Sequence, residues 1–231
     1  KGNLVHEVVE QLYLPYRNRI LKPTDFKQMK ERLLPLMEEC YQTMYHGAEY
    51  RTGRNHIIFE VLKKSILDFL TIEEKCVLEG NRIEILHLED QFEQSIQVPG
   101  IDFPIKLLGV VDRIDLYNDT LRIIDYKTGM IQPRQLKLTH WEVFDEQTDY
   151  AYLFQILLYS YVQKPLLSKH QKAAAGIISF RNLPQYFMAF STENDEYQAL
   201  NQENLDRFEK TLFRLINEIF DPKVNFNDRS K

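Results

Sequence analysis

Two aspartates and a lysine, Asp112, Asp125 and Lys127, lie close together in the stretch GVVDRIDLYNDTLRIIDYKTG at residues 109–129. A hard divalent cation such as Mg²⁺ prefers oxygen ligands, and a pair of carboxylates completed by water and a substrate phosphate is a usual site for it. A lysine at the same place supplies positive charge. If the fold brings the three side chains together, these residue types indicate metal-assisted chemistry on a phosphate.

A β-hairpin would bring them together. Residues 110–117 and 120–127 both have strand character. Between them lies the pair Asn118-Asp119, which tolerates positive φ and suits a tight turn. A two-residue loop at this pair, or a four-residue loop centred on it, would place Asp112 directly opposite Asp125. A three-residue loop would instead put the two aspartates on opposite faces.

The predicted register has an electrostatic consequence. Opposed side chains have Cβ atoms roughly 4.5–5.5 Å apart, so ionised carboxylates at 112 and 125 would repel each other unless a cation lies between them. Because side chains alternate along a strand, Lys127 shares their face. Asp115 and Arg122 would face each other on the other side as an ordinary cross-strand ion pair. Aspartate and lysine are also common on solvated strands, so a structural ion-pair network is the competing interpretation.

The residues around this hairpin resemble a known family. Gly-Val-Val-Asp112-Arg-Ile-Asp, followed by Ile-Ile-Asp125-Tyr126-Lys127-Thr-Gly, resembles the signature of the RecB-like branch of the PD-(D/E)XK nuclease superfamily. In that family a Gly-x-x-Asp strand precedes an Asp-Tyr-Lys strand. The resemblance implies that Asp112, Asp125 and Lys127 are catalytic. It also implies that Mg²⁺ or Mn²⁺ is bound by both aspartates and by the backbone carbonyl of Tyr126.

Two further positions resemble metal-site residues of the family. Apolar residues at 5, 8, 9 and 12 predict a helix with one buried stripe, and His6 lies at the edge of that stripe. A lone histidine there is more often a packed or surface residue. The family, however, carries a metal-binding histidine in a Leu-Val-His-like helix, which implies that His6 is a further ligand. Glu89, in Leu-Glu-Asp-Gln-Phe, resembles a glutamate that often opens a strand in the family, and we expect it to have a supporting role.

The apolar segment 150–162 predicts a buried helix, in which Gln155 and Tyr159 are four residues apart and share a face. Each could simply form a local hydrogen bond within the core. A Gln-x-x-x-Tyr pair after Asp-Tyr-Lys nevertheless resembles the strand-binding motif of the family, which implies that both residues bind DNA.

Three arginines are candidates for phosphate contact. Residues 22–78 are predicted to be helical almost throughout, with Pro35 causing a kink or a fresh start, and we interpret them as an accessory helical insertion. Arg51 and Arg54 lie in a glycine-flanked turn of this insertion. Arg134 lies in the segment 129–147, which has no clear periodicity and is expected to be a loop beside the active site.

The remaining pattern predicts the fold class. Strand character appears at about 82–98, 173–180 and 186–191, and a final helix is predicted at about 193–220. With the insertion set aside, the order is helix, three strands, helix, strand. This is the αβββαβ order of the PD-(D/E)XK core. We therefore predict an α/β restriction-endonuclease-like fold, with a central mixed sheet flanked by helices, in a single domain over residues 1–231.

Composition limits the possible functions. The 231 residues are 44% hydrophobic and 27% charged, which is ordinary for a globular protein. No run of about 18 apolar residues predicts a membrane span, and the first residues do not resemble a signal peptide. Cys40 and Cys76 fit a reducing compartment, so we predict a cytoplasmic location. A net charge of -5 argues against a uniformly basic nucleic-acid binder, but a nuclease needs only a local basic surface.

The resemblance implies a divalent-metal-dependent DNA nuclease of exonuclease type that acts in recombination and repair. Its expected partners are DNA and a helicase domain or subunit, with no membrane. We expect the chain to be one domain of a longer protein. Several relatives bind an iron-sulfur cluster, for which Cys40 and Cys76 alone cannot supply the ligands. One alternative is a catalytically silent nuclease-like module that binds DNA or a partner in a helicase-nuclease complex. The other is an unrelated α/β enzyme.

Overall fold

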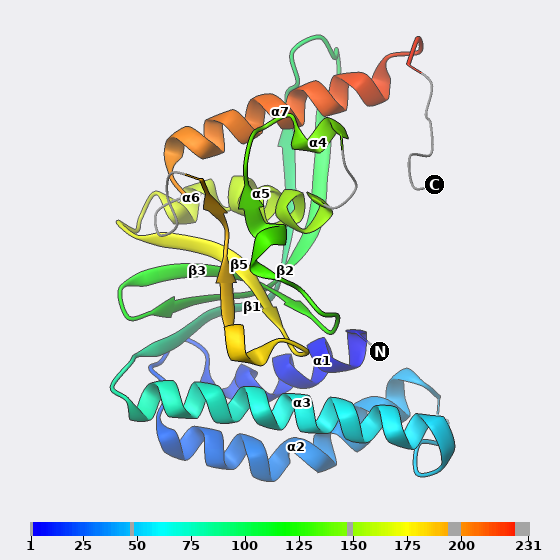
Figure 1. The fold of residues 1–231 in the computed structure, drawn as a ribbon, viewed down its shortest axis with the longest axis vertical. Helices are drawn as coiled ribbons and strands as arrows, with labels where there is room; N and C mark the ends of the chain where they lie inside the picture. Colours follow the sequence, from blue (N-terminus) through cyan, green and yellow to red (C-terminus); the bar gives the residue numbers. More distant parts are fainter. Residues whose placement is uncertain (1, 47–48, 147–149, 194–199, 225–231) are drawn as a thin grey trace.

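A mixed β-sheet lies at the centre of the computed structural model, which describes residues 2–46, 49–146, 150–193 and 200–224. Within these ranges the main sheet has five strands in the order β1-β2-β3-β5-β6 (Figure 1). Strands β3 and β5 are parallel, and the other neighbouring pairs are antiparallel. The strand bounds are β1 Ile83–Ile96, β2 Ile105–Tyr117, β3 Thr120–Lys127, β5 Ala173–Ser179 and β6 Phe187–Ala189.

Helices cover both faces of this sheet (Figure 1). One face packs against α1 (Gly2–Tyr13), α2 (Pro23–Met44) and α3 (Gly53–Leu78). The other face packs against α5 (Ala151–Val162) and α7 (Gln202–Phe220). Each helical layer shares a hydrophobic core with the sheet. The predicted α/β fold class, a mixed sheet flanked by helices, is confirmed.

Shorter elements connect these layers. The segment 129–147 was predicted to be a loop, but its described part contains short helices and a short strand. Its residues Leu136, Leu138 and Val143 are buried in the core shared with α5, which holds the segment in an ordered conformation. The predicted helix at 193–220 begins only at Gln202, and residues 194–199 lie outside the described part of the chain. The short elements are η1 Leu14–Tyr16, η2 Pro133–Leu136, β4 Lys137–Leu138, α4 Val143–Glu146, α6 Lys164–Leu167, η4 Leu183–Gln185 and β7 Ser191–Thr192. Strand β4 pairs with β7 in parallel.

The hairpin between β2 and β3 has the predicted register. Tyr117 pairs with Thr120, and the ladder continues from there to the pair Arg113 and Ile124. Asn118 adopts a φ of 54°, the positive φ that asparagine tolerates in a tight hairpin turn. Because side chains alternate along each strand, this register puts the site aspartates on the face covered by α5.

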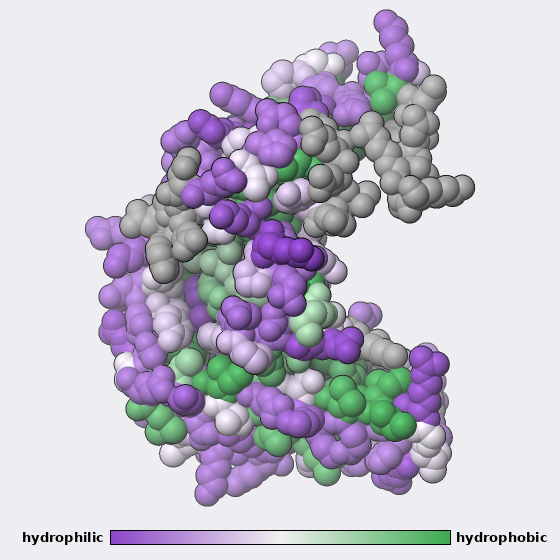
Figure 2. All heavy atoms as spheres, viewed as in Figure 1, coloured by the Kyte–Doolittle hydropathy of each residue, from purple (hydrophilic) through white to green (hydrophobic). Residues whose placement is uncertain are grey.

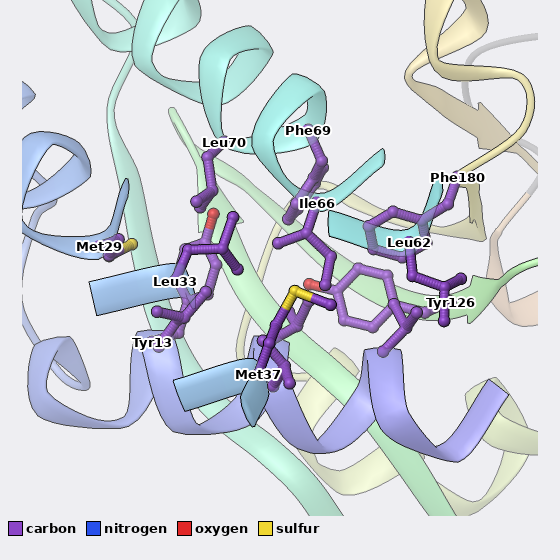
Figure 3. Packing of buried hydrophobic residues seen from close by; sticks show 14 of the residues in the cluster. Tyr13, Met29, Leu33, Met37, Leu62, Ile66, Phe69, Leu70, Tyr126 and Phe180 are labelled. Carbon is purple, nitrogen blue, oxygen red and sulfur yellow. The ribbon is translucent and has the colours of Figure 1, made fainter. Parts of the chain in front are cut away.

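The helices expected to be an accessory insertion contribute a large part of the core on the opposite face, together with α1 and the sheet. Figure 3 shows α2 and α3 side chains packed beside Tyr126 of β3. Helix α2 continues through Pro35, so of the two predicted effects of this proline, a kink or a fresh start, the fresh start does not occur. A proline removes one intrahelical hydrogen bond. Here Leu33 and Met37 are buried on either side of it and hold the helix in place.

An ionic network lies inside this core. Arg113, Asp115 and Glu73 are fully buried, and Arg122 is 4% exposed. Arg113 Nη1 lies 2.9 Å from a Glu73 carboxylate oxygen, and Arg122 donates to both oxygens of Asp115 at 2.8 Å. The hydroxyls of Tyr13 and Tyr186 each donate to Glu73 at 2.5 Å. The pair Asp115 and Arg122, expected to be ordinary, is therefore part of a buried network that joins α3 to the sheet.

Removing one carboxylate from this network should be strongly destabilising. The substitution Glu73→Ala would leave two buried guanidinium groups facing one buried carboxylate, and breaking a buried pair in this way costs about 3–5 kcal/mol. The measurement is the free energy of unfolding in urea, followed by circular dichroism. The control is Glu79→Ala, because Glu79 forms an exposed 3.7 Å pair with Lys75. It should change stability by no more than about 0.5 kcal/mol. Equal losses in the two variants would contradict a stabilising role for the network.

Candidate active site

Three carboxylates form a row across neighbouring strands. The β1–β2 ladder on either side of Glu89 places it opposite Asp112. The β2–β3 register, extended by one residue beyond its last pair, brings Asp112 level with Asp125. Asp112 and Asp125 are 7% and 2% exposed. We call Glu89, Asp112 and Asp125 the carboxylate row.

The row lies where β2 parts from β3. The last ladder pair is Arg113 with Ile124, so beyond it the N–H and C=O groups of Tyr126 have no backbone partner on β2. Side chains replace that partner. Asp112 Oδ2 accepts a hydrogen bond from the Tyr126 N–H at 2.6 Å, and His6 Nε2 lies 3.1 Å from the Tyr126 carbonyl oxygen. The gap in the ladder therefore exposes a backbone carbonyl to the site.

His6 reaches the row from α1, in the opposite helical layer. Its Nδ1 lies 3.3 Å from Asp112 Oδ1 and 3.6 Å from Glu89 Oε1. Burial of the imidazole lowers its pKa, but hydrogen bonds to the two carboxylates and their charges outweigh that effect and raise the pKa to about 10. The two carboxylates therefore favour the imidazolium form of His6, whose charge partly neutralises the row.

Lys127 neutralises the other end of the row. Its Nζ lies 2.6 Å from Asp125 Oδ2 and donates to Gln155 Oε1 at 3.0 Å. Burial and the neighbouring charge of Asp112 raise the pKa of Asp125 to about 6, although Lys127 and His6 act in the opposite direction. The two aspartates therefore repel each other, as the predicted register implied.

Helix α5 adds polar groups to the same face. Gln155 donates from Nε2 to the Tyr159 hydroxyl at 2.6 Å. The sequence analysis did not single out Tyr152, whose ring centre lies 5.6 Å from Lys127 Nζ. The available signal was its spacing, because residues 152, 155 and 159 follow one face of a helix.

The donor atoms fit a divalent cation. Single ligand atoms of His6, Glu89 and Asp112 all lie within 4.8 Å of one another. Asp125 Oδ2 is buried and has no hydrogen bond of normal geometry, although Lys127 lies beside it. Carboxylate and carbonyl oxygens suit Mg²⁺ and Mn²⁺, and an imidazole is compatible with Mn²⁺.

Glu89 has an uncommon backbone conformation. Its φ is 45°, within a strand whose neighbouring residues pair with β2. A non-glycine residue in this region is under strain of about 1–2 kcal/mol. Its side chain nevertheless faces His6 and Asp112. Sequence reasoning assigned Glu89 only a supporting role, because a strand pattern does not reveal such a kink.

The three predicted phosphate-binding arginines have surroundings of their own. Arg51 stacks on Tyr50, 5.4 Å from the ring centre, and lies 4.0 Å from Glu38. Arg54, in the first turn of α3, and Arg134, in η2, are exposed. Among the described residues, no hydrogen bond or ion pair joins any of the three to the carboxylate row. Their contact with DNA remains a prediction.

One side of the molecule is hollowed. Figure 2 shows a recess between the layer of α2 and α3 and the layer that contains α7. The amino-terminal end of α1, the helix that carries His6, lies at this recess (Figure 1).

Comparisons with known proteins agree with the motif. A family model described as the PD-(D/E)XK nuclease superfamily matches residues 1–231. No significant match was found among curated proteins. A solved structure described as that of SSO0001 is 14% identical and aligns over 97% of this chain and 96% of its own. Its TM-score of 0.26 is too low to carry a structural argument. No helix in the described part of the chain is long and apolar enough to cross a membrane.

A divalent cation should stabilise the folded protein, because it would relieve the repulsion between Asp112 and Asp125. With free Mn²⁺ at 100 times its Kd, the gain is about 2.7 kcal/mol, which corresponds to a rise in Tm of roughly 5–10 °C. Differential scanning fluorimetry with and without Mn²⁺ measures this shift. The substitution Asp112→Asn should abolish it. Asp119→Asn, in the exposed turn of the same hairpin, should preserve it. A full shift in Asp112→Asn would place the cation elsewhere.

The strain at Glu89 can be tested separately. Glycine adopts positive φ without a Cβ penalty, so in the metal-free protein Glu89→Gly should be more stable than Glu89→Ala by about 1 kcal/mol. Both variants lack the carboxylate and should bind Mn²⁺ less tightly than the parent protein. Urea unfolding and calorimetric titration measure the two properties. If the alanine variant were the more stable of the two, the positive φ would be refuted.

Proposed function

The chain belongs to the PD-(D/E)XK nuclease superfamily, and from that membership we propose that it is a divalent-metal-dependent deoxyribonuclease that hydrolyses phosphodiester bonds. One observation carries the proposal: Asp112, Asp125 and Lys127 lie on one face of a hairpin, next to His6 and the Tyr126 carbonyl, which has no backbone partner on β2. This constellation supports cleavage more strongly than silent binding, because a silent module would not need both aspartates and the lysine.

Asp112, Asp125, the Tyr126 carbonyl and His6 would hold the Mg²⁺ or Mn²⁺, and Glu89 would offer a further carboxylate. When bound there, the cation would polarise the scissile phosphate and lower the pKa of a bound water. The contacts of His6 with Asp112 and Glu89 hold the imidazole at the site.

Lys127 would act on the reacting phosphate directly. Asp125 and Gln155 fix its ammonium at 2.6 Å and 3.0 Å. A fixed positive donor stabilises the negative charge that develops on phosphate oxygens as water attacks, and it can orient that water. The buried position of Asp125 beneath it limits access of bulk solvent and strengthens these electrostatic effects.

The finer features are also proposals. Contacts of Arg51, Arg54 and Arg134 with DNA phosphates would hold the strand without reading its sequence. An exonuclease role in recombination and repair, with a helicase domain or subunit as partner, is supported by the RecB-like combination of His6, the Gly-x-x-Asp strand and the Asp-Tyr-Lys strand. The cytoplasmic location predicted from the two cysteines belongs with these proposals.

The direct test is cleavage of end-labelled linear and closed-circular DNA, single- and double-stranded, with Mg²⁺, Mn²⁺ or EDTA. We expect metal-dependent cleavage of linear DNA that EDTA abolishes. Asp125→Ala and Lys127→Ala should each lower kcat at least about 100-fold, because each removes electrostatic or proton-transfer catalysis.

The control for these variants is Lys106→Ala, since Lys106 is exposed near the start of β2 and pairs with Glu93. It should cleave like the parent protein. Cleavage of circular DNA as fast as linear DNA would indicate an endonuclease instead. Absence of both cleavage and Mn²⁺ binding would refute the active-site assignment. Mn²⁺ and DNA binding without cleavage would favour the silent module.

A further inference from the structure

A cavity of about 320 Å³ lies on the face of the sheet opposite the carboxylate row. Side chains alternate along β3, so Arg122 lines this cavity while Asp125 faces the other helical layer. The volume is at the lower end of the range for ligand pockets. No carboxylate lines the cavity in the part of the chain that the structure describes. Its walls include Tyr117, Arg122, Ala174, Gln185, Tyr186 and Phe187.

The cavity exists because a small residue lies beside a long one. Ala174 of β5 pairs with Arg122 of β3, so only a methyl group covers the sheet next to the guanidinium. Tyr186 and Phe187, at the start of β6, enclose the space from the next strand. The size of residue 174 therefore sets the volume, and a larger side chain there would fill it.

The Arg122 guanidinium has one edge without an acceptor. Asp115 occupies the other edge, because Nε and Nη2 donate to its two oxygens at 2.8 Å. Within the described residues, Nη1 has no hydrogen-bond partner. The side chain is only 4% exposed, so bulk water cannot fully solvate this donor. A buried donor without an acceptor is costly, which indicates that the free edge is built for an acceptor from outside the chain.

Three aromatic rings surround this guanidinium. Its central carbon lies 4.4 Å from the ring centre of Tyr117, 5.2 Å from that of Phe187 and 5.7 Å from that of Tyr186. Tyr186 has a φ of 38°, which is uncommon for a residue other than glycine, and its hydroxyl bond to Glu73 holds it there. Aromatic faces and guanidinium planes both stack on planar heterocycles. The walls are therefore suited to a flat ring.

The charge behind the cavity favours a neutral ligand. The buried network contains the guanidinium groups of Arg113 and Arg122 and the carboxylates of Glu73 and Asp115. Their charges balance, so an anion in the cavity would be a partly buried charge without a counter-ion, which is costly. A carbonyl oxygen accepts from Nη1 without that cost. The cavity thus favours a planar, uncharged ring that carries a carbonyl group.

We propose that this cavity binds a nucleobase, separately from the proposed catalytic site. The base stacks among Tyr117, Tyr186 and Phe187, and its carbonyl oxygen accepts from Arg122 Nη1. Gln185, exposed at the rim, offers an amide donor and acceptor to the edge of the base. A free nucleoside and an unpaired base of a nucleic-acid strand share this chemistry.

Calorimetric titration with deoxyinosine tests the site, in EDTA so that the proposed metal site does not contribute. We expect a Kd of roughly 0.1 mM, which is ordinary for a ligand of this size. The deoxyriboside of unsubstituted purine has the same ring system without the carbonyl group. It should bind roughly 10-fold more weakly or worse, because it leaves a charged donor without an acceptor.

Two matched variants locate the binding. Ala174→Leu fills the cavity and should weaken deoxyinosine binding by at least about 10-fold. The control is Ala173→Leu, because Ala173 is the neighbouring residue on β5 and lines a different cavity. It should bind deoxyinosine like the parent protein. Circular dichroism shows whether both variants fold. If Ala174→Leu does not fold, Gln185→Ala replaces it and should weaken binding roughly 2- to 10-fold.

A competition experiment identifies the source of the base. Displacement of deoxyinosine by single-stranded oligodeoxythymidylate, also in EDTA, would support a base within a strand as the ligand. Deoxyinosine binding that the oligonucleotide does not displace would support a free nucleoside.

Four results would overturn the proposal. They are absence of deoxyinosine binding, equal binding of the purine analogue, unchanged binding in a folded cavity variant, and displacement of deoxyinosine by inorganic phosphate, which would indicate an anion site. None of these results depends on cleavage, so the proposed nuclease activity stands or fails by its own test.

Discussion

The separation of β2 from β3 just beyond the pair Arg113 and Ile124 is the constraint on which the site depends. A continued ladder would satisfy the Tyr126 N–H and C=O groups with backbone of β2. Because the strands part, buried polar groups need other partners, and Asp112 and His6 supply them. The same gap gathers carboxylates, an imidazole and a carbonyl oxygen around one point. The site is thus formed by the side chains that hydrogen-bond to the backbone groups left unpaired where the sheet is interrupted.

The opposite face of the same strands stabilises this arrangement. Arg113, next to Asp112 in sequence, points into the helical layer and donates to the Tyr126 hydroxyl at 3.2 Å. The Tyr126 ring also contacts His6 edge-to-face, with the centres 6.1 Å apart. Strand alternation therefore separates two sets of charges. The structural ion-pair network, which was one interpretation of the hairpin, lies on one face, and the candidate metal site lies on the other.

Turn chemistry and the spacing of apolar residues were sufficient to predict the hairpin and the fold class. The Asn-Asp pair favoured a two-residue loop but left a three-residue loop possible. The structure has the register of the two-residue loop, and with it alternation puts Asp112, Asp125 and Lys127 on one face. The apolar periodicity of 150–162 likewise predicted α5 and the shared face of Gln155 and Tyr159. Predictions of element ends were less reliable. The helix expected from 193 begins at Gln202, where Asn201 caps it through the backbone N–H of Asn204.

By itself, the sequence determined which residues could bind a metal and which strands carry them, because turn chemistry and side-chain alternation act over a few residues. Only the tertiary structure decided which distant residues complete the site. Glu73 on α3 pairs with Arg113, the positive φ of Glu89 directs a carboxylate to His6, and Gln155 joins Lys127 to Tyr159. These contacts depend on how the helical layers pack on the sheet and on where the β2–β3 ladder ends. Neither can be predicted from the residue pattern of a single segment.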